Sequence, residues 1–95
     1  MSKKISELAV EALEAGRNFK RANTRVDGHA QELYLFENLI AKIECESLYI
    51  TLAGWVTLTT CERLNALNGV YIKRKQGRAY LNGQEIDPNK WYKID

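Results

Sequence analysis

The period of the hydrophobic pattern changes along this chain, and that change limits the fold more than any other feature of the sequence. From Arg17 to Trp55, apolar residues recur mainly at every second position, which is the period of a strand that buries one face. The turn dipeptides Asp27-Gly28 and Glu37-Asn38 divide this segment. The pattern therefore predicts four consecutive antiparallel strands, with Glu37-Asn38 as a two-residue hairpin turn.

A helical pattern precedes these strands. Its apolar positions fall on one face of a helix and are Ile5, Leu8, Ala9, Ala12 and Leu13. Gly16 follows and readily adopts the left-handed conformation that ends many helices, so we expect a helix over residues 1–16. Because the stripe is rich in alanine, we expect this helix either to dock weakly or to serve as a movable arm.

The helical pattern returns after Trp55. Thr59 and Glu62 have the spacing of a capping box, in which each side chain bonds to a backbone N–H at the start of a helix. Cys61 and Leu64 follow on one face, and Gly69 ends this short element. We therefore expect a second helix that begins at Thr59.

Alternation resumes beyond Gly69, on both sides of the turn dipeptide Gln76-Gly77. The residues that point inward on this hairpin are expected to be Val70, Ile72, Ala79 and Leu81. Those that point outward are expected to be Tyr71, Lys73, Lys75 and Tyr80. Asn82-Gly83 and Asp87-Pro88-Asn89 predict two further turns before a last strand over residues 90–94.

The order of these elements predicts an α+β domain. It consists of an N-terminal helix, a mainly antiparallel sheet of six to seven short strands, and a short helix between the fourth and fifth strands. The length of 95 residues suits a single domain over residues 1–95.

No residue pattern that marks catalysis occurs in the sequence. The single histidine, His29, lies in a turn-like segment without a Cys or Asp at the local spacing of a metal site or a triad. Glycine-rich phosphate-binding motifs are absent. We therefore expect no enzyme activity, no cofactor and no bound metal.

Two cysteines, Cys45 and Cys61, have neither metal-site spacing nor the number needed for a disulfide framework. We expect both to be packed as free thiols, in a reducing, cytosolic setting. The amino terminus lacks the apolar run of a signal peptide, and no apolar stretch is long enough to span a membrane.

Positive charge is concentrated in two clusters. The first consists of Arg17, Lys20, Arg21 and Arg25, and the second of Lys73, Arg74, Lys75 and Arg78. Beside the second cluster, Tyr71 and Tyr80 could stack on bases while the cations meet phosphates. The alternative is that aromatic and charged side chains pair across a two-sided sheet, where charge discourages edge-to-edge association.

Several aromatic residues bear on the surface. Trp55 follows Gly54 at a strand end and is expected to plug the core, with an exposed interface anchor as the alternative. Trp91 and Tyr92 occupy opposite faces of the last strand, so one of them should be partly exposed. The strand at residues 33–36 is apolar on both faces, so either the first helix or a partner, including a second copy of this chain, should cover the second face.

From about Asn18 to its end, the chain resembles small single-domain proteins encoded by tailed bacteriophages, mostly of unassigned function. The resemblance rests on Asn23-Thr24, Leu33-Tyr34-Leu35, Asn38, Ile40-Ala41, Gly54-Trp55, Thr59-Thr60, Arg63-Leu64-Asn65, Leu67, Gly69-Val70, Tyr80-Leu81-Asn82-Gly83 and Trp91. The sequence departs from that pattern at Phe36-Glu37, where a His-Gly pair is typical, and at Cys61, where a polar or basic residue is typical. These departures argue against a shared role for Cys61 and leave the turn type of the first hairpin open.

The resemblance implies an accessory phage protein that acts in the cytoplasm of the bacterial host. We expect it to be non-catalytic and to bind a bacterial protein or nucleoprotein complex. The leading hypothesis is that it inhibits a host defence complex, as an anti-CRISPR protein does. The alternative is a nucleic-acid-binding module that uses the two basic clusters, over residues 17–25 and 73–78. No membrane partner is expected, and a homodimer is compatible with the sequence.

Overall fold

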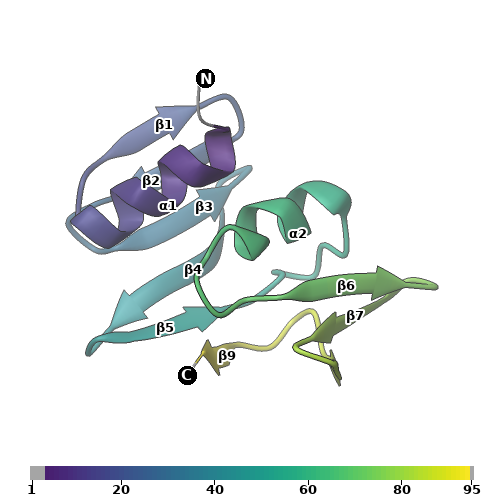
Figure 1. The fold of residues 1–95 in the computed structure, drawn as a ribbon. Helices are drawn as coiled ribbons and strands as arrows, with labels where there is room; N and C mark the ends of the chain where they lie inside the picture. The colour runs from purple at the N-terminus through teal and green to yellow at the C-terminus, as the bar shows by residue number, and fades with distance from the viewer. Residues whose placement is uncertain (1–3, 95) are drawn as a thin grey trace.

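A computed structural model describes residues 4–94 of the chain. Within this range the chain forms two helices and nine strands (Figure 1). In chain order they are α1 Ile5–Ala15, β1 Phe19–Arg21, β2 Thr24–Asp27, β3 Glu32–Leu35, β4 Asn38–Glu44, β5 Ser47–Ile50, α2 Leu58–Asn65, β6 Ile72–Lys75, β7 Arg78–Leu81, β8 Gln84–Ile86 and β9 Tyr92–Ile94.

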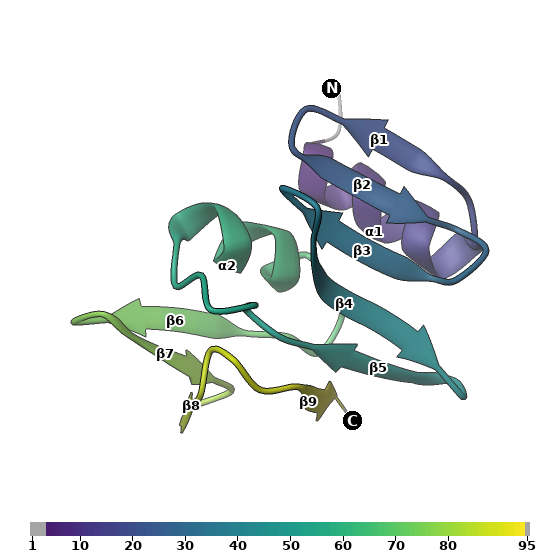
Figure 2. The same ribbon diagram turned by 180° about the vertical axis from the view of Figure 1, so that it is seen from behind.

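The strands form two antiparallel sheets. The larger has the order β1-β2-β3-β4-β5-β9, and the smaller has the order β6-β7-β8. Strand β9 returns to pair with β5, where Ile50 lies opposite Tyr92. Helix α1 covers one face of β1–β3, and α2 lies above the smaller sheet (Figures 1 and 2). The α+β class and the mainly antiparallel sheet are therefore confirmed.

The number of strands was predicted wrongly, as nine strands replace the expected six to seven and α2 follows the fifth strand rather than the fourth. The main cause is a hairpin inside the segment that was expected to be a single first strand. Arg21 pairs with Thr24 across a two-residue turn, in which Ala22 has a φ of 53°. Because this turn contains no glycine, the sequence gives no strong signal for it.

The turn between β3 and β4 lies one residue earlier than expected. Leu35 pairs with Asn38, so the turn residues are Phe36 and Glu37, with φ of 50° and 62°. Positive φ at both positions is the geometry of a type I′ turn, which matches the twist of the flanking strands. The predicted Glu37-Asn38 turn is therefore wrong, and the strand twist has imposed a left-handed conformation on two residues that disfavour it.

Helix α1 is docked on the larger sheet. Ala9 and Leu13 are fully buried, and Gly16 ends the helix with a φ of 69°, as expected. The exit of the helix packs against the β2–β3 turn at Gly28, where an added Cβ would lie 2.3 Å from the carbonyl carbon of Arg17. The backbone at this crossing therefore comes too close for any side chain.

The N-cap of helix α2 lies two residues earlier than predicted, at Thr57 rather than Thr59. Thr57 is the N-cap, and its hydroxyl accepts a hydrogen bond from the backbone N–H of Thr60 over 3.3 Å. The capping box at Thr59 and Glu62 is therefore wrong, because Thr57 has the extended backbone that an N-cap needs while Thr59 is already helical. Cys61 and Leu64 are buried, as their spacing predicted.

Arg63 joins three parts of the fold. Its guanidinium donates hydrogen bonds to Thr24 Oγ1 over 2.9 Å and to Ser6 Oγ over 2.8 Å, and a longer one to Asn23 Oδ1. These bonds link α2 to α1 and to the β1–β2 hairpin. Both helices are thereby fixed in position relative to the larger sheet.

The alternation of the β6–β7 hairpin was predicted correctly. Its inward residues Val70, Ile72, Ala79 and Leu81 are all buried. By contrast, the expectation that both cysteines are packed holds for Cys61 but is wrong for Cys45, which is exposed. Cys45 and Glu46 form the β4–β5 turn, with φ of 52° and 65°, and a side chain at such a turn points away from the core.

Candidate functional site

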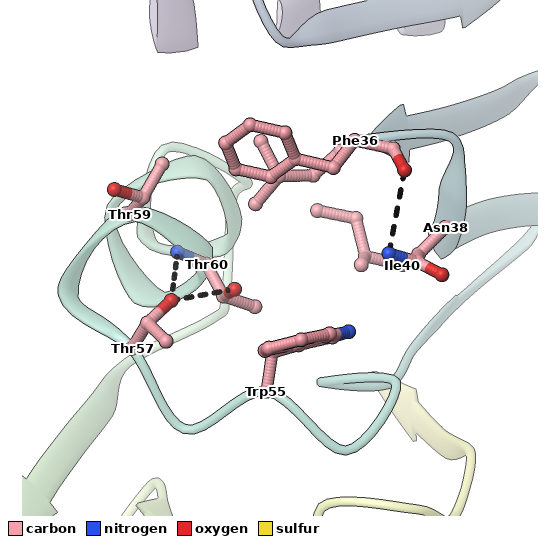
Figure 3. A pocket seen from close by; sticks show the side chains of 8 residues that line it. Phe36, Asn38, Ile40, Trp55, Thr57, Thr59 and Thr60 are labelled. Carbon is pink, nitrogen blue, oxygen red and sulfur yellow. Dashed lines mark hydrogen bonds between the residues drawn. The ribbon is translucent and has the colours of Figure 1, made fainter.

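A groove opens between the β3–β4 turn, the chain after β5 and the start of α2. We name it the aromatic groove. It has a volume of about 500 Å³ and is lined by Leu35, Phe36, Asn38, Ile40, Trp55, Thr57, Thr59 and Thr60. Phe36 and Trp55 stand on opposite sides of it, and the threonines of α2 form a third side (Figure 3). Leu35 and Ile40 are buried in the core, so the floor of the groove is fixed by the fold.

The Phe36 side of the groove is presented by the β3–β4 turn. The backbone N–H of Phe36 donates to Asn23 O over 2.8 Å, which ties this turn to the β1–β2 hairpin. Glu37 pairs with Arg25 over 3.1 Å, and the guanidinium of Arg25 lies 4.1 Å from the centre of the Tyr34 ring. The turn is thus braced on both sides, while 66% of Phe36 is exposed.

The Trp55 side of the groove is presented by a second tight turn. The backbone N–H of Trp55 donates to Leu52 O over 2.9 Å, and Ala53 and Gly54 between them have φ of 53° and 82°. Gly54 N donates in turn to Pro88 O over 3.0 Å, which fixes this turn to the loop before β9. Residues 52–55 therefore hold the indole at a defined place.

Trp55 does not plug the core, so the expectation for it was wrong. Leu52 is fully buried and fills that place, and the turn after it directs Trp55 outward, where 56% of the residue is exposed. The neighbouring Leu58 is 58% exposed at the first residue of α2. Two large aromatic residues, Phe36 and Trp55, are thus exposed at the sides of one groove, and Leu58 is a third exposed apolar residue close to Trp55 in the chain. The Gly54-Trp55 pair is the sequence signal that could have indicated this outward direction, because the glycine permits the tight turn that precedes Trp55.

The polar side of the groove is formed by threonines. Thr57 and Thr60 hydroxyl oxygens lie 3.0 Å apart, and Thr57 also caps α2. Asn38 donates to Phe36 O over 3.4 Å at the opposite side. The groove therefore combines an apolar floor and two aromatic edges with neutral polar groups, and no charged residue lines it.

The two basic clusters lie in different sheets. In the first cluster, Arg17 precedes β1, Lys20 and Arg21 lie on β1, and Arg25 lies on β2. The second cluster lies in the β6–β7 hairpin. Both views place β1 and β2 at one end of the molecule and this hairpin toward the other end (Figures 1 and 2). The structure therefore does not bring the clusters together, and Arg25 is engaged by Glu37, whose hydrogen bond raises the pKa of the guanidinium above its ordinary value.

Within the second cluster, the side chains divide between two faces. Tyr71, Lys73, Lys75, Arg78 and Tyr80 share the outer face, as the register of β6 and β7 requires. Arg74 lies on the opposite face, beside Ala79. Arg78 pairs with Glu85 over 3.5 Å, and the Lys73 ammonium lies 5.3 Å from the centre of the Tyr71 ring. Tyr71 is exposed and Tyr80 is half-buried.

The remaining candidate residues from the sequence are His29, Trp91 and Tyr92. His29 is exposed in the β2–β3 turn, and within residues 4–94 no group of three or more His, Cys, Asp or Glu side chains is arranged to hold a metal ion. Trp91 is partly exposed, and the Lys42 ammonium lies 4.8 Å from the centre of its ring. Tyr92 is half-buried, so the prediction that one of these two residues is partly exposed is confirmed.

In the described part of the chain, no helix is both long and apolar enough to cross a membrane.

Comparison with known proteins agrees with the resemblance seen in the sequence. No curated protein and no solved structure matches the chain. The family model of the Kyanoviridae Gp96 protein matches residues 2–94, which is nearly the whole chain. The protein therefore belongs to the Kyanoviridae Gp96 family, a family of tailed-cyanophage proteins of unassigned function.

Proposed function

We propose that this protein is a non-catalytic phage accessory protein that binds a bacterial protein through the aromatic groove, in the cytoplasm of the host. One observation carries the proposal: two aromatic side chains, Phe36 and Trp55, are more than half exposed on braced turns at opposite sides of one groove. Exposed aromatic residues of this kind are the usual centres of binding energy at protein interfaces.

The exposure of these residues favours a protein over a small molecule as the partner. A small ligand would occupy the space between Phe36 and Trp55 but would leave their outer surfaces in water. A protein surface covers both side chains, and it can place one apolar side chain on the floor formed by Leu35 and Ile40. The absence of charge in the lining also suits a desolvated interface centre.

The turns themselves support a binding role. Phe36 and Glu37 both adopt a left-handed backbone, which costs on the order of 1 kcal/mol or more for a residue other than glycine or asparagine. Such strained residues cluster at functional sites. Here the strained residue is also the most exposed aromatic residue of the described chain.

The specific form to test is inhibition of a host defence complex. Tagged protein is used to capture partners from cyanobacterial host lysate, in parallel with variants Phe36→Ser and Trp55→Ser. The matched controls are Tyr71→Ser and Trp91→Ser, which remove exposed aromatic residues outside the groove. We expect one stoichiometric protein that is captured by the wild type and both controls and is lost with both groove variants.

Two results would contradict the proposal. The first is capture that survives both groove variants, which would place the interface elsewhere. The second is sedimentation of the purified protein as a dimer that dissociates in the groove variants, which would show that a second copy covers the groove. Defence inhibition is then measured as phage plating on a host that carries the captured complex, with and without the protein.

A further inference from the structure

The second basic cluster forms the tip of a projecting hairpin. All six residues from Lys73 to Arg78 are exposed, and four of them carry positive charge. In both views the β6–β7 turn extends beyond α2 and the rest of the molecule (Figures 1 and 2). The tip is therefore accessible from several sides, unlike a flat patch on a sheet.

The charge of this tip is present on both faces of the ribbon. Lys73, Lys75 and Arg78 point to the outer face, whereas Arg74 points to the face that carries Ile72 and Ala79. Among the residues that the structure describes, no carboxylate lies within ion-pair distance of Lys73, Arg74 or Lys75, and Arg78 has only an exposed contact with Glu85. Most of the charge at the tip is thus available to a ligand.

The base of the hairpin is held firmly although its tip is free. The Asn65 side chain bonds to both the N–H and the carbonyl oxygen of Ile72, over 2.6 and 3.0 Å. The Asn82 side chain accepts from Tyr71 N over 3.1 Å and donates to Gly69 O over 3.2 Å. The turn residues Gln76 and Gly77 have φ of 51° and 77°, as a type I′ turn needs. The cations are therefore carried on a preorganised element.

We propose that the β6–β7 hairpin binds double-stranded DNA by placing its tip, residues 73–78, in the major groove. A flat acidic protein surface can meet only one face of the ribbon and would leave Arg74 in water. A DNA groove has phosphates on both walls, and the major groove of B-form DNA, about 12 Å wide, admits a two-stranded β-ribbon. The deep, narrow major groove of A-form RNA does not.

Cations that meet phosphates give binding that depends on salt rather than on sequence. Lys73, Lys75 and Arg78 would face one phosphate wall and Arg74 the other. With about four phosphates neutralised, log K falls with log salt concentration with a slope of about −3.6. Each cation removed reduces that slope by about 0.9 and weakens binding to all sequences similarly.

The test is fluorescence anisotropy with a DNA duplex of about two helical turns, the matching single strand and a matching RNA duplex, starting at about 50 mM salt. The variants are Lys73→Gln/Lys75→Gln for the outer face and Arg74→Gln for the opposite face. The matched control is Lys20→Gln/Arg21→Gln, which removes the same charge from exposed positions on β1. Circular dichroism confirms that each variant is folded.

We expect the DNA duplex to bind best, the outer-face variant to reduce the salt slope by about 2, and Arg74→Gln to reduce it by about 1. The β1 control should bind like the wild type. Unchanged binding by Arg74→Gln would overturn the two-faced contact, and tighter binding to the single strand would assign the tyrosines a stacking role instead. Equal losses in the control would show non-specific attraction, and no binding to the duplex at low salt would reject the proposal.

Discussion

The side-chain amide of Asn65 is bonded to the backbone of Ile72 in both directions: it accepts from the N–H over 2.6 Å and donates to the carbonyl oxygen over 3.0 Å. Ile72 is the first residue of an edge strand, so these two backbone groups would otherwise lack a strand partner. A side chain from α2 thus takes the place of a neighbouring strand and fixes the smaller sheet to the helix.

We predict that Asn65→Ala lowers the free energy of unfolding by about 1–3 kcal/mol, because it leaves two backbone groups of the buried Ile72 without partners. Urea denaturation measures the change. Asn68→Ala, at an exposed position three residues later, serves as the control and should stay within about 0.5 kcal/mol of the wild type. Equal stability of the two variants would show that water replaces the amide of Asn65.

Gly28→Ala is predicted to be among the most damaging single substitutions. The new methyl group would lie 2.3 Å from Arg17 C and 2.5 Å from Gly16 O, and both are backbone atoms that cannot turn aside. We expect a loss of at least about 2 kcal/mol, measured by thermal or urea unfolding. The control is Gly77→Ala, where no atom lies within 4 Å and only the positive φ costs free energy, so a loss of about 1 kcal/mol is expected.

The double change Phe36→Asn/Glu37→Gly should stabilise the fold and abolish binding through the aromatic groove. Asn-Gly is the preferred pair for a type I′ turn, so relief of left-handed strain should exceed the loss of the exposed Arg25–Glu37 pair, for a net gain of about 1 kcal/mol. Stability is measured by urea denaturation, and binding by the capture assay.

Gln76→Asn, in the hairpin tip turn, is the control for that change. It should also stabilise the fold but should leave capture of the partner intact, because Gln76 does not line the groove. Because the double variant removes the Phe36 ring, retained capture would contradict the proposed role of Phe36 in binding.

The two thiols should differ sharply in reactivity. Burial raises the pKa of the Cys61 thiol, although the charge of Arg74 lowers it in part, whereas Cys45 is exposed in a turn. In the native state a thiol reagent at pH 8 should modify Cys45 rapidly and Cys61 only after denaturation. Mass spectrometry of the labelled protein checks this, and fast labelling at Cys61 would mean that α2 opens readily.

The raised pKa of Cys61 also sets a dependence of stability on pH. Because the folded state holds this proton more tightly than the unfolded state, the stabilisation is complete below the ordinary thiol pKa of 9.0 and is lost as pH rises above it. The pKa of Tyr34 is raised as well, mainly by its hydrogen bond to Glu32, and adds to the loss above pH 10. Urea midpoints should therefore fall above about pH 9, and less steeply in Cys61→Ala.

The periodic elements of the fold could be predicted from the sequence. The stripe of α1, the buried face of the β6–β7 hairpin and the core positions of α2 followed from spacing alone, because burial of one face imposes that spacing. The turns at Ala22 and Phe36 could not be placed, because their left-handed residues are not the Gly, Asn or Asp that normally mark such turns. The pairing of the flanking strands, and not the preference of the turn residues, sets these left-handed conformations.

Of the two candidate sites, one could be predicted from the sequence and the other could not. The basic hairpin was visible as a local charge cluster, and its register followed from alternation. The aromatic groove was not predicted, since it brings together Phe36 from one hairpin and Trp55 from a later loop, and only tertiary packing sets their relation. Trp55 was assigned to the core because a tryptophan after a strand is usually buried, but Leu52 already occupies that place.

The pairing of β5 with β9 has a consequence for how members of this family can diverge. Because Ile50 and Tyr92 are cross-strand partners, the chain between them leaves the larger sheet and returns to adjacent backbone positions. That excursion contains Trp55, the cap of α2 and the whole basic hairpin. Insertions, deletions or exchanges within it would change both surfaces while the strand order of the larger sheet stays the same. The larger sheet and α1 can thus stay the same while the segment between Ile50 and Tyr92 varies.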